Sequence, residues 1–126
     1  MTTQRATMDR ETFYTGLLLK AQGREFSTSE DALRQPFAEA LRSAKDDPDG
    51  PRILGIDWAV AEDPIRQTRF IAELVAFGMS SRLIYVDLES GQARTRSQDA
   101  HRKLAETIGH EAWFERVGGA FASGLK

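Results

Sequence analysis

The stretch that decides the predicted fold is residues 52–96, RILGIDWAVAEDPIRQTRFIAELVAFGMSSRLIYVDLESGQARTR. Apolar side chains fall on both faces of residues 53–60, as in a strand that is covered on two sides. Asp63 can then accept hydrogen bonds from the free amides of a helix start. Pro64 suits the first helical position because it has no amide hydrogen to leave unpaired. The stretch therefore begins with a predicted strand and continues into a predicted helix.

The helix predicted after this strand spans residues 64–77, because apolar side chains recur at helical spacing and Gly78 can close it in a left-handed conformation. Residues 82–88 are again apolar on both faces and rich in β-branched and aromatic side chains, so we expect a second strand. A turn at Gly91 would let residues 92–96 return as an antiparallel edge strand. Two apolar strands joined by one helix favour a parallel, right-handed crossover.

Apolar side chains recur at helical spacing in two segments before this stretch. The first helix is expected to be capped by Asp9 or Thr7 and to end at Gly23. In the second segment, Ser27 and Glu30 match a capping box. Pro36 removes a backbone donor within it, so we expect either a kink or two short helices there.

Two more helices are expected after the stretch, one capped by Ser97 and ending at Gly109, and a last one from about Glu111. The fold class is therefore α+β, or a small α/β layer. We expect about five helices packed on a three-stranded mixed sheet built from a β-α-β unit plus a hairpin, with the two apolar strands as neighbours.

The chain of 126 residues is expected to form a single domain, residues 1–126, with a core large enough to need no disulfides or metal. Residues 1–8 are polar and unanchored, so we expect them to be disordered. Residues 45–51, KDDPDGP, combine charge with two prolines and a glycine, and we expect an exposed loop there.

The composition limits the classes of function. The chain has 17 basic and 19 acidic side chains, which weighs against a protein whose whole surface binds nucleic acid. The absence of cysteine excludes disulfides and thiolate chemistry. No window approaches the roughly 20 apolar residues that cross a bilayer, so we expect a cytoplasmic protein that does not contact membranes. The excess of Arg over Lys and the frequent Ala suggest a bacterial source.

No catalytic signature, nucleotide-binding loop or metal-ligand set stands out, so the sequence predicts no cofactor and favours a protein that is not an enzyme. One metal hypothesis concerns Asp57 and Asp87, which both fall near the carboxyl ends of the two predicted parallel strands, where α/β sheets place ligands. Carboxylates within about 5 Å of each other can share a magnesium ion. In the alternative, Asp57 accepts amide hydrogen bonds before Pro64, and Asp87 prepares the hairpin turn.

Basic side chains gather in the predicted hairpin and the helix after it. A hairpin with arginines that follows a helix is typical of the wing of a winged-helix DNA-binding domain. A related hypothesis makes residues 74–88 a helix-turn-helix, with Gly78 at the turn and Ser80 capping a recognition helix. The alternative is a solvated edge strand protected by charge. The candidate nucleic-acid contacts are Arg82, Arg94, Arg96, Arg102 and Lys103.

The last predicted helix carries a heavy apolar stripe that serves either as core or as a contact surface. As a surface, it would form a homodimer seam or a groove for a partner helix. The candidate interface residues are Trp113, Phe114, Val117 and Phe121.

Three functions follow from these observations. The leading hypothesis is a small, soluble, non-enzymatic regulatory or adaptor protein that acts through protein–protein contacts, as a homo-oligomer. The second is a DNA-binding transcriptional regulator that uses the basic hairpin. The third is a metal-dependent enzyme that uses Asp57 and Asp87.

Overall fold

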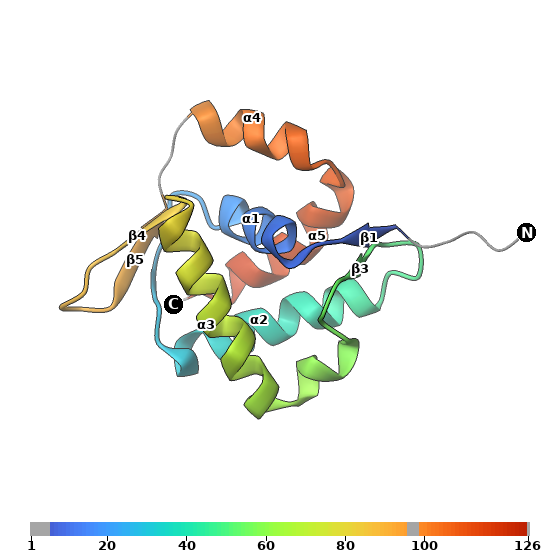
Figure 1. Cartoon of the computed structure of the whole chain (residues 1–126), viewed down its shortest axis with the longest axis horizontal. Coiled ribbons are helices and arrows are strands. Elements are labelled where there is room, and N and C mark those ends of the chain that lie inside the picture. The colour runs from blue at the N-terminus through green and yellow to red at the C-terminus, as the bar shows by residue number, and fades with distance from the viewer. Residues whose placement is uncertain (1–5, 96–98, 126) are drawn as a thin grey trace, which may run out of the picture.

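Five α-helices and one short 3-10 helix dominate the computed structural model, which describes residues 6–95 and 99–125, with side chains from Lys103 onward in the second part. Helix α1 crosses the middle of the molecule and contacts α3, α4 and α5 (Figure 1). The helices are α1 (Arg10–Lys20), α2 (Glu30–Lys45), the 3-10 helix η1 (Trp58–Glu62), α3 (Pro64–Ser80), α4 (Asp99–Ile108) and α5 (Glu111–Ser123).

The strands are short and form two separate sheets. A parallel pair joins β1 (Thr7–Met8) to β3 (Arg52–Ile53). An antiparallel sheet contains, in spatial order, β2 (Glu25–Ser27), β5 (Gln92–Thr95) and β4 (Ile84–Val86). The predicted hairpin is present as β4 and β5, and it projects from one side of the molecule (Figure 1). Within the described residues, five helices thus pack with a small three-stranded sheet and a parallel strand pair, which confirms the α+β fold class.

The strand arrangement differs from the predicted β-α-β unit, because β3 ends at Ile53. Gly55 adopts a left-handed conformation, with φ of +83°, and turns the chain out of the sheet. Asp57 then accepts a hydrogen bond from the Ala59 amide at 2.9 Å and starts η1. As a result, β3 and β4 lie in different sheets, and β2 is the third strand of the antiparallel sheet.

Local capping chemistry sets the starts of α1 and α3, as the sequence predicted. Asp9 accepts a hydrogen bond from the Thr12 amide at 2.7 Å at the start of α1. At the start of α3, Asp63 accepts a hydrogen bond from the Arg66 amide at 3.3 Å, and Pro64 occupies the first turn. Each carboxylate satisfies an amide that has no partner within its helix.

Helix α2 begins two residues later than predicted and does not divide. Its cap is Ser29 rather than Ser27, because the Ser29 hydroxyl accepts a hydrogen bond from the Ala32 amide at 3.2 Å. The helix runs through Pro36 as one element, and the proline ring is buried. The two short helices expected as one alternative at this proline are therefore not formed.

Helix α3 continues to Ser80, beyond its predicted end at residue 77. Gly78 lies inside the helix, where an added Cβ would come within 2.9 Å of the side chains of Ile84 and Leu18. The missing side chain makes room for the hairpin to pack against α3. The left-handed turn comes instead at Arg82, with φ of +62°.

The chain after this turn is extended. Residues 84–86 form β4. No recognition helix therefore spans residues 74–88, and the helix-turn-helix interpretation of this segment is incorrect. Its strand propensity prevails, because Ile84 and Val86 pack toward α3 from an extended backbone.

The apolar stripe of α5 lies inside the protein, between 0 and 4% exposed. Helices α1 and α2 cover it, and the ring of Phe114 fills the space beside Gly16, where an added Cβ would overlap it. One chain already buries these side chains, which leaves them no exposed surface for a homodimer seam or a partner groove. The residues of this stripe are Trp113, Phe114, Val117 and Phe121.

Two segments expected to be disordered or exposed are partly held in place. Of residues 1–8, Thr7 and Met8 form β1 and Met8 is buried, whereas residues 1–5 lie outside the described part of the chain. In the predicted loop of residues 45–51, Gly50 is buried against the indole of Trp113. Across residues 6–95 and 99–125, no helix combines the length and the apolar character needed to cross a membrane.

Candidate functional site

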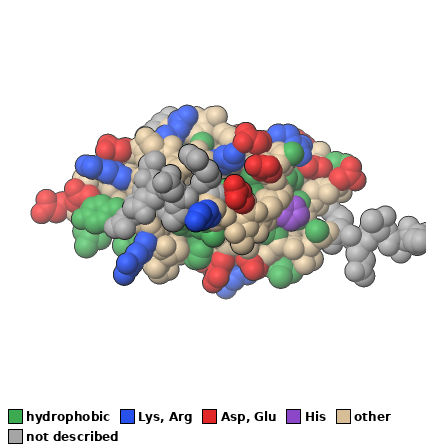
Figure 2. Space-filling view, turned by 90° about the horizontal axis from the view of Figure 1, so that it is seen from above, with side chains coloured by type: hydrophobic (Ala, Val, Ile, Leu, Met, Phe, Trp, Pro, Cys, Tyr) green, Lys and Arg blue, Asp and Glu red, His purple; other side chains and the backbone are tan. Residues whose placement is uncertain are grey.

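A shallow depression runs along β4 in the projecting hairpin. Its volume is about 560 Å³, and it lies between the end of α3 and the hairpin turn. Figure 2 shows exposed hydrophobic side chains at the end of the molecule where the hairpin lies, with acidic side chains beside them. The depression is lined by Met79, Arg82, Ile84, Tyr85, Val86, Asp87, Leu88 and Glu89.

Three large apolar side chains of this depression are open to solvent. Met79 is 43% exposed, Tyr85 60% and Leu88 84%. Successive side chains of a strand point to opposite faces, so Tyr85 faces outward while Ile84, 3% exposed, packs inward beside Gly78. We call Met79, Tyr85 and Leu88, together with the outer edge of β4, the hairpin face.

The turn that closes the hairpin is held by its own hydrogen bonds. The Asp87 amide donates to the Gln92 carbonyl at 2.9 Å, and the Gly91 amide donates to the Asp87 carbonyl at 2.7 Å. The Asp87 carboxylate accepts a hydrogen bond from the Glu89 amide at 2.9 Å. Asp87 is thus a turn residue, as the alternative to the metal hypothesis predicted, and it fixes the backbone next to Leu88.

The predicted metal site is not assembled. Asp57 lies at the start of η1, where its carboxylate forms an ion pair with Arg66 at 2.7 Å. Its hydrogen bonds with Arg66 lower the pKa of Asp57. Asp57 and Asp87 line separate depressions, beside β3 and β4, which belong to different sheets. Among the described side chains, no group of three or more His, Asp or Glu residues is placed to hold a metal ion.

The candidate nucleic-acid contacts lie on different elements. Arg82 follows α3, is exposed, and forms no ion pair with any described carboxylate within 4.0 Å. Arg94 lies in β5 and pairs with Glu25 of β2 at 3.1 Å, and Lys103 is an exposed residue of α4. Arg96 and the side chain of Arg102 lie outside the described part of the chain. Of the three described cations, only Arg82 lines the depression beside β4.

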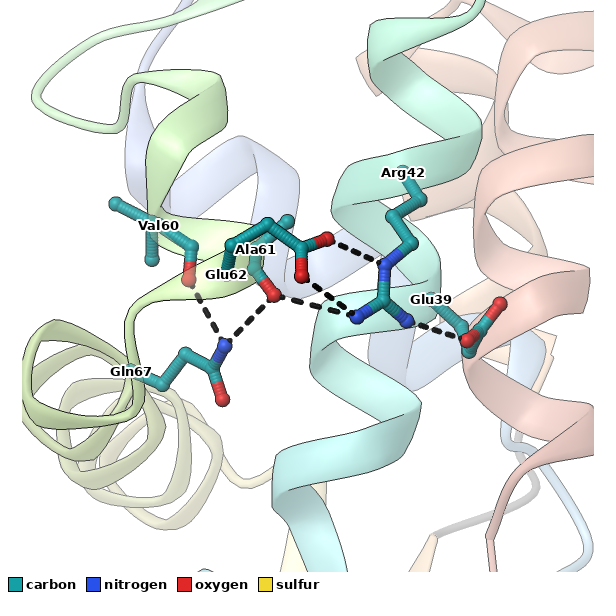
Figure 3. Close-up of polar contacts among 6 residues, drawn as sticks. All are labelled: Glu39, Arg42, Val60, Ala61, Glu62 and Gln67. Carbon is teal, nitrogen blue, oxygen red and sulfur yellow. Dashed lines mark hydrogen bonds and ion pairs between the residues drawn. The ribbon is translucent and has the colours of Figure 1, made fainter.

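Other arginines stabilise the fold. Figure 3 shows Arg42 of α2 between two carboxylates, with Glu39 at 2.6 Å and Glu62 at 2.8 Å. The buried side chain of Gln67, in α3, donates to the carbonyls of Val60 and Ala61 at 2.9 and 3.0 Å. These contacts attach η1 to α2 and α3, in the place where the sequence predicted the end of the first apolar strand.

A buried tyrosine joins α1 to α3. The Tyr14 hydroxyl donates to a Glu73 carboxylate oxygen at 2.8 Å, and Arg10 Nε donates to the same oxygen at 2.6 Å. Burial, followed by the hydrogen bond to Glu73, raises the pKa of Tyr14. Burial opposes the ionisation of Glu73, but the hydrogen bonds from Arg10 and Tyr14 outweigh it and lower the pKa of that carboxyl. Tyr14 keeps its proton and donates it in a hydrogen bond to the Glu73 carboxylate. This cluster is therefore arranged to stabilise the fold rather than to act as a base or nucleophile.

Comparisons with known proteins find no matching family model, no similar curated protein and no similar solved structure.

Proposed function

We propose that this chain is a small, non-enzymatic regulatory or adaptor protein that binds other protein chains through the hairpin face. The observation that carries the proposal is that Met79, Tyr85 and Leu88 are exposed beside one depression. Single exposed apolar residues are ordinary, but apolar side chains grouped on one surface are typical of protein-binding sites. Met and Tyr are also enriched in such interfaces.

The rigidity of the hairpin also supports binding. Ile84 holds β4 against α3 from the inner side, and the hydrogen bonds of Asp87 fix the turn. A surface that is ordered before binding loses less conformational entropy when a partner arrives. The hairpin face is therefore suited to contact a partner with little rearrangement.

The proposal is tested by selecting binders from a phage-displayed library of random peptides. We expect selected peptides to bind the wild-type protein and to lose at least about tenfold in affinity for the double variant Tyr85→Ser, Leu88→Ser, because truncating central apolar contacts removes most of the binding energy. The matched control is Ile65→Ser, since Ile65 is 85% exposed in α3 but does not line the depression. Equal losses for the double variant and for Ile65→Ser, or selection of no peptide by a chain that stays monomeric, would contradict the proposal.

A second candidate, a DNA-binding regulator, is supported by the order of the elements. Helix α1, strand β2, helices α2 and α3, and the hairpin of β4 and β5 follow the order of a winged helix, and the sheet order β2-β5-β4 agrees with it. In that arrangement, α3 would enter a groove and the hairpin would act as the wing. The chain departs from it between α2 and α3, where β3 and η1 are inserted.

The charges near α3 and the hairpin favour protein over DNA. Asp87 and Glu89 stand at the hairpin turn, where a wing would approach phosphates. In α3, Arg66 is already paired with Asp57. A shared order of elements does not establish a shared function, so the DNA-binding candidate ranks second.

A gel-shift titration with random-sequence duplex DNA at two salt concentrations tests the DNA-binding candidate. If it holds, binding weakens steeply as salt rises, and Arg69→Glu in the exposed face of α3 weakens it further. Absence of a shift at low salt, or a shift that neither added salt nor Arg69→Glu weakens, would remove this candidate.

A further inference from the structure

The outer edge of β4 carries backbone groups that point away from the sheet. Asp87 and Gln92 form a hydrogen-bonded pair, since the Asp87 amide donates to the Gln92 carbonyl at 2.9 Å. Such pairs alternate with non-bonded pairs along an antiparallel ladder. By the observed register, Tyr85 is therefore bonded to Arg94, whereas Ile84 and Val86 direct their amides and carbonyls outward.

These outward groups have no partner within the described residues. β5 is the sole neighbour that β4 has in its sheet, and no hydrogen bond from another described segment reaches the backbone of Ile84 or Val86. An edge of this kind is a template for an added strand. Residues 84–86 contain no lysine or proline, and their one-to-one register with β5 contains no bulge, so three devices that commonly protect such edges are missing there.

The charges along this edge are complementary to those of the same edge on a second copy that is rotated by 180°. Arg82 precedes β4, whereas Asp87 and Glu89 follow it. If a second β4 is placed antiparallel beside the first, Arg82 of each copy approaches the acidic end of the other. A parallel arrangement would instead place Arg82 beside Arg82 and the acids beside the acids, and like charges at short range repel.

We propose that the partner of the hairpin face is a second copy of this chain, joined by antiparallel pairing of β4 with β4 about a two-fold axis. The proposal rests on the proposed protein-binding function and names its partner. It joins the two three-stranded sheets into one continuous antiparallel sheet in the order β2-β5-β4-β4-β5-β2. The open edges of both copies are satisfied together.

The register follows from the direction of the backbone groups. Hydrogen-bonded pairing requires outward-pointing residues to oppose one another, which is met when Ile84 of one copy lies opposite Val86 of the other. Tyr85 of one copy then lies opposite Tyr85 of the other, on the two-fold axis. The two form a non-hydrogen-bonded pair, the kind in which cross-strand side chains approach most closely. Leu88 comes beside the aliphatic part of Arg82 of the other copy. The exposed apolar side chains of β4 and its turn are thus placed at the seam.

A charge-swap series tests this pairing by sedimentation equilibrium, over about 5 to 500 µM protein, a range that covers the affinities of small interfaces. We expect the apparent mass to rise with concentration toward about twice the 14.1 kDa of one chain. Arg82→Glu and Glu89→Lys should each weaken association about tenfold or more, because each places like charges together at both ends of the seam. The double variant should restore association, since it exchanges the two charges.

Arg24→Glu is the matched control, because it makes the same charge change at an exposed residue before β2, on the opposite edge of the sheet. It should leave association unchanged. A dimer that the two single variants leave intact, or that the double variant fails to restore, would place the seam elsewhere and overturn the inference.

The result also separates this inference from the proposed function. A wild-type chain that stays monomeric throughout the range, while selected peptides still bind the hairpin face, overturns the β4 pairing and leaves the proposed function standing. A monomeric chain that selects no peptide overturns both.

Discussion

Two apolar segments of this protein, the stripe of α5 and strand β4, are buried to very different extents. The aromatic stripe of α5, for which the sequence left core and contact surface both open, is almost completely buried within one chain. The strand in residues 82–88, which is apolar on both faces and was expected to be covered on both, lies at the edge of its sheet with Tyr85 60% exposed. In β4, the position of the element in the fold decides burial more than its composition does.

The difference arises from what each segment has beside it. Two positions of the α1–α5 contact lack side chains: Gly16 accepts the ring of Phe114, and Gly118 lies against the aliphatic stem of Lys20. The hairpin extends beyond the helices, so β4 packs against α3 through its inner face alone. Substitutions in the α5 stripe should therefore change stability, whereas substitutions in the hairpin face should change binding.

The largest expected effect is in the α5 stripe. Phe121→Ala should lower the free energy of unfolding by about 3 to 5 kcal/mol, because a fully buried aromatic ring is lost and a cavity remains. Urea unfolding followed by circular dichroism measures this change. A loss below about 1 kcal/mol would show that the stripe is not core, and the comparison between the two segments would fail.

A second test addresses the close contact of α1 with α5. Gly16→Ala should destabilise the protein by about 1 to 3 kcal/mol, because the added methyl group overlaps the ring of Phe114 and forces the helices apart. Gly119→Ala is the matched control, since an added Cβ there meets no atom within 4 Å. That control should be neutral or stabilising by up to about 1 kcal/mol, as alanine favours a helix interior. Equal destabilisation by both variants would contradict the proposed packing.

Local chemistry explains what the sequence predicted correctly. Asp9 and Asp63 cap their helices through amides three residues ahead, and the turn at Gly91 joins strands that are adjacent in sequence. Such signals need no information from the rest of the chain. Together with the helical spacing of apolar side chains, they were sufficient to predict the helices, the hairpin and the α+β fold class.

Long-range pairing explains what the sequence could not provide. Strand β2 has three residues, and Phe26 pairs with Ala93 far along the chain, so no local periodicity indicates it. The end of β3 depends on the conformation of Gly55, which an apolar alternating pattern conceals. The hairpin face was missed for the same reason, because the exposure of Tyr85 depends on the strand order. A glycine such as Gly16, in the middle of a helix, was the available signal that an aromatic ring packs there.

A smaller effect should separate the buried tyrosine from the exposed one. Tyr14→Phe should cost about 1 kcal/mol near pH 8, because it removes the hydrogen bond to Glu73. The pKa of Tyr14 is raised in the folded state, so its contribution is complete below the unfolded value of 10.0 and is lost as pH rises above it. The melting temperatures of wild type and variant should therefore converge above about pH 10. Tyr85→Phe, at an exposed position, should show neither effect, and a constant difference between wild type and Tyr14→Phe would contradict the assignment.

The smallest effect on stability is expected for Leu88→Ser, and it tests the other half of the comparison. Leu88 is 84% exposed, so its replacement should change the free energy of unfolding by less than about 0.5 kcal/mol, measured by urea unfolding at low protein concentration. The low concentration matters, since any self-association would add stability that belongs to the assembly and not to the single chain. A loss comparable to that of Phe121→Ala would mean that the hairpin packs onto its own chain. In that case the apolar side chains of the hairpin face would be core, and the argument for a binding surface would lose its basis.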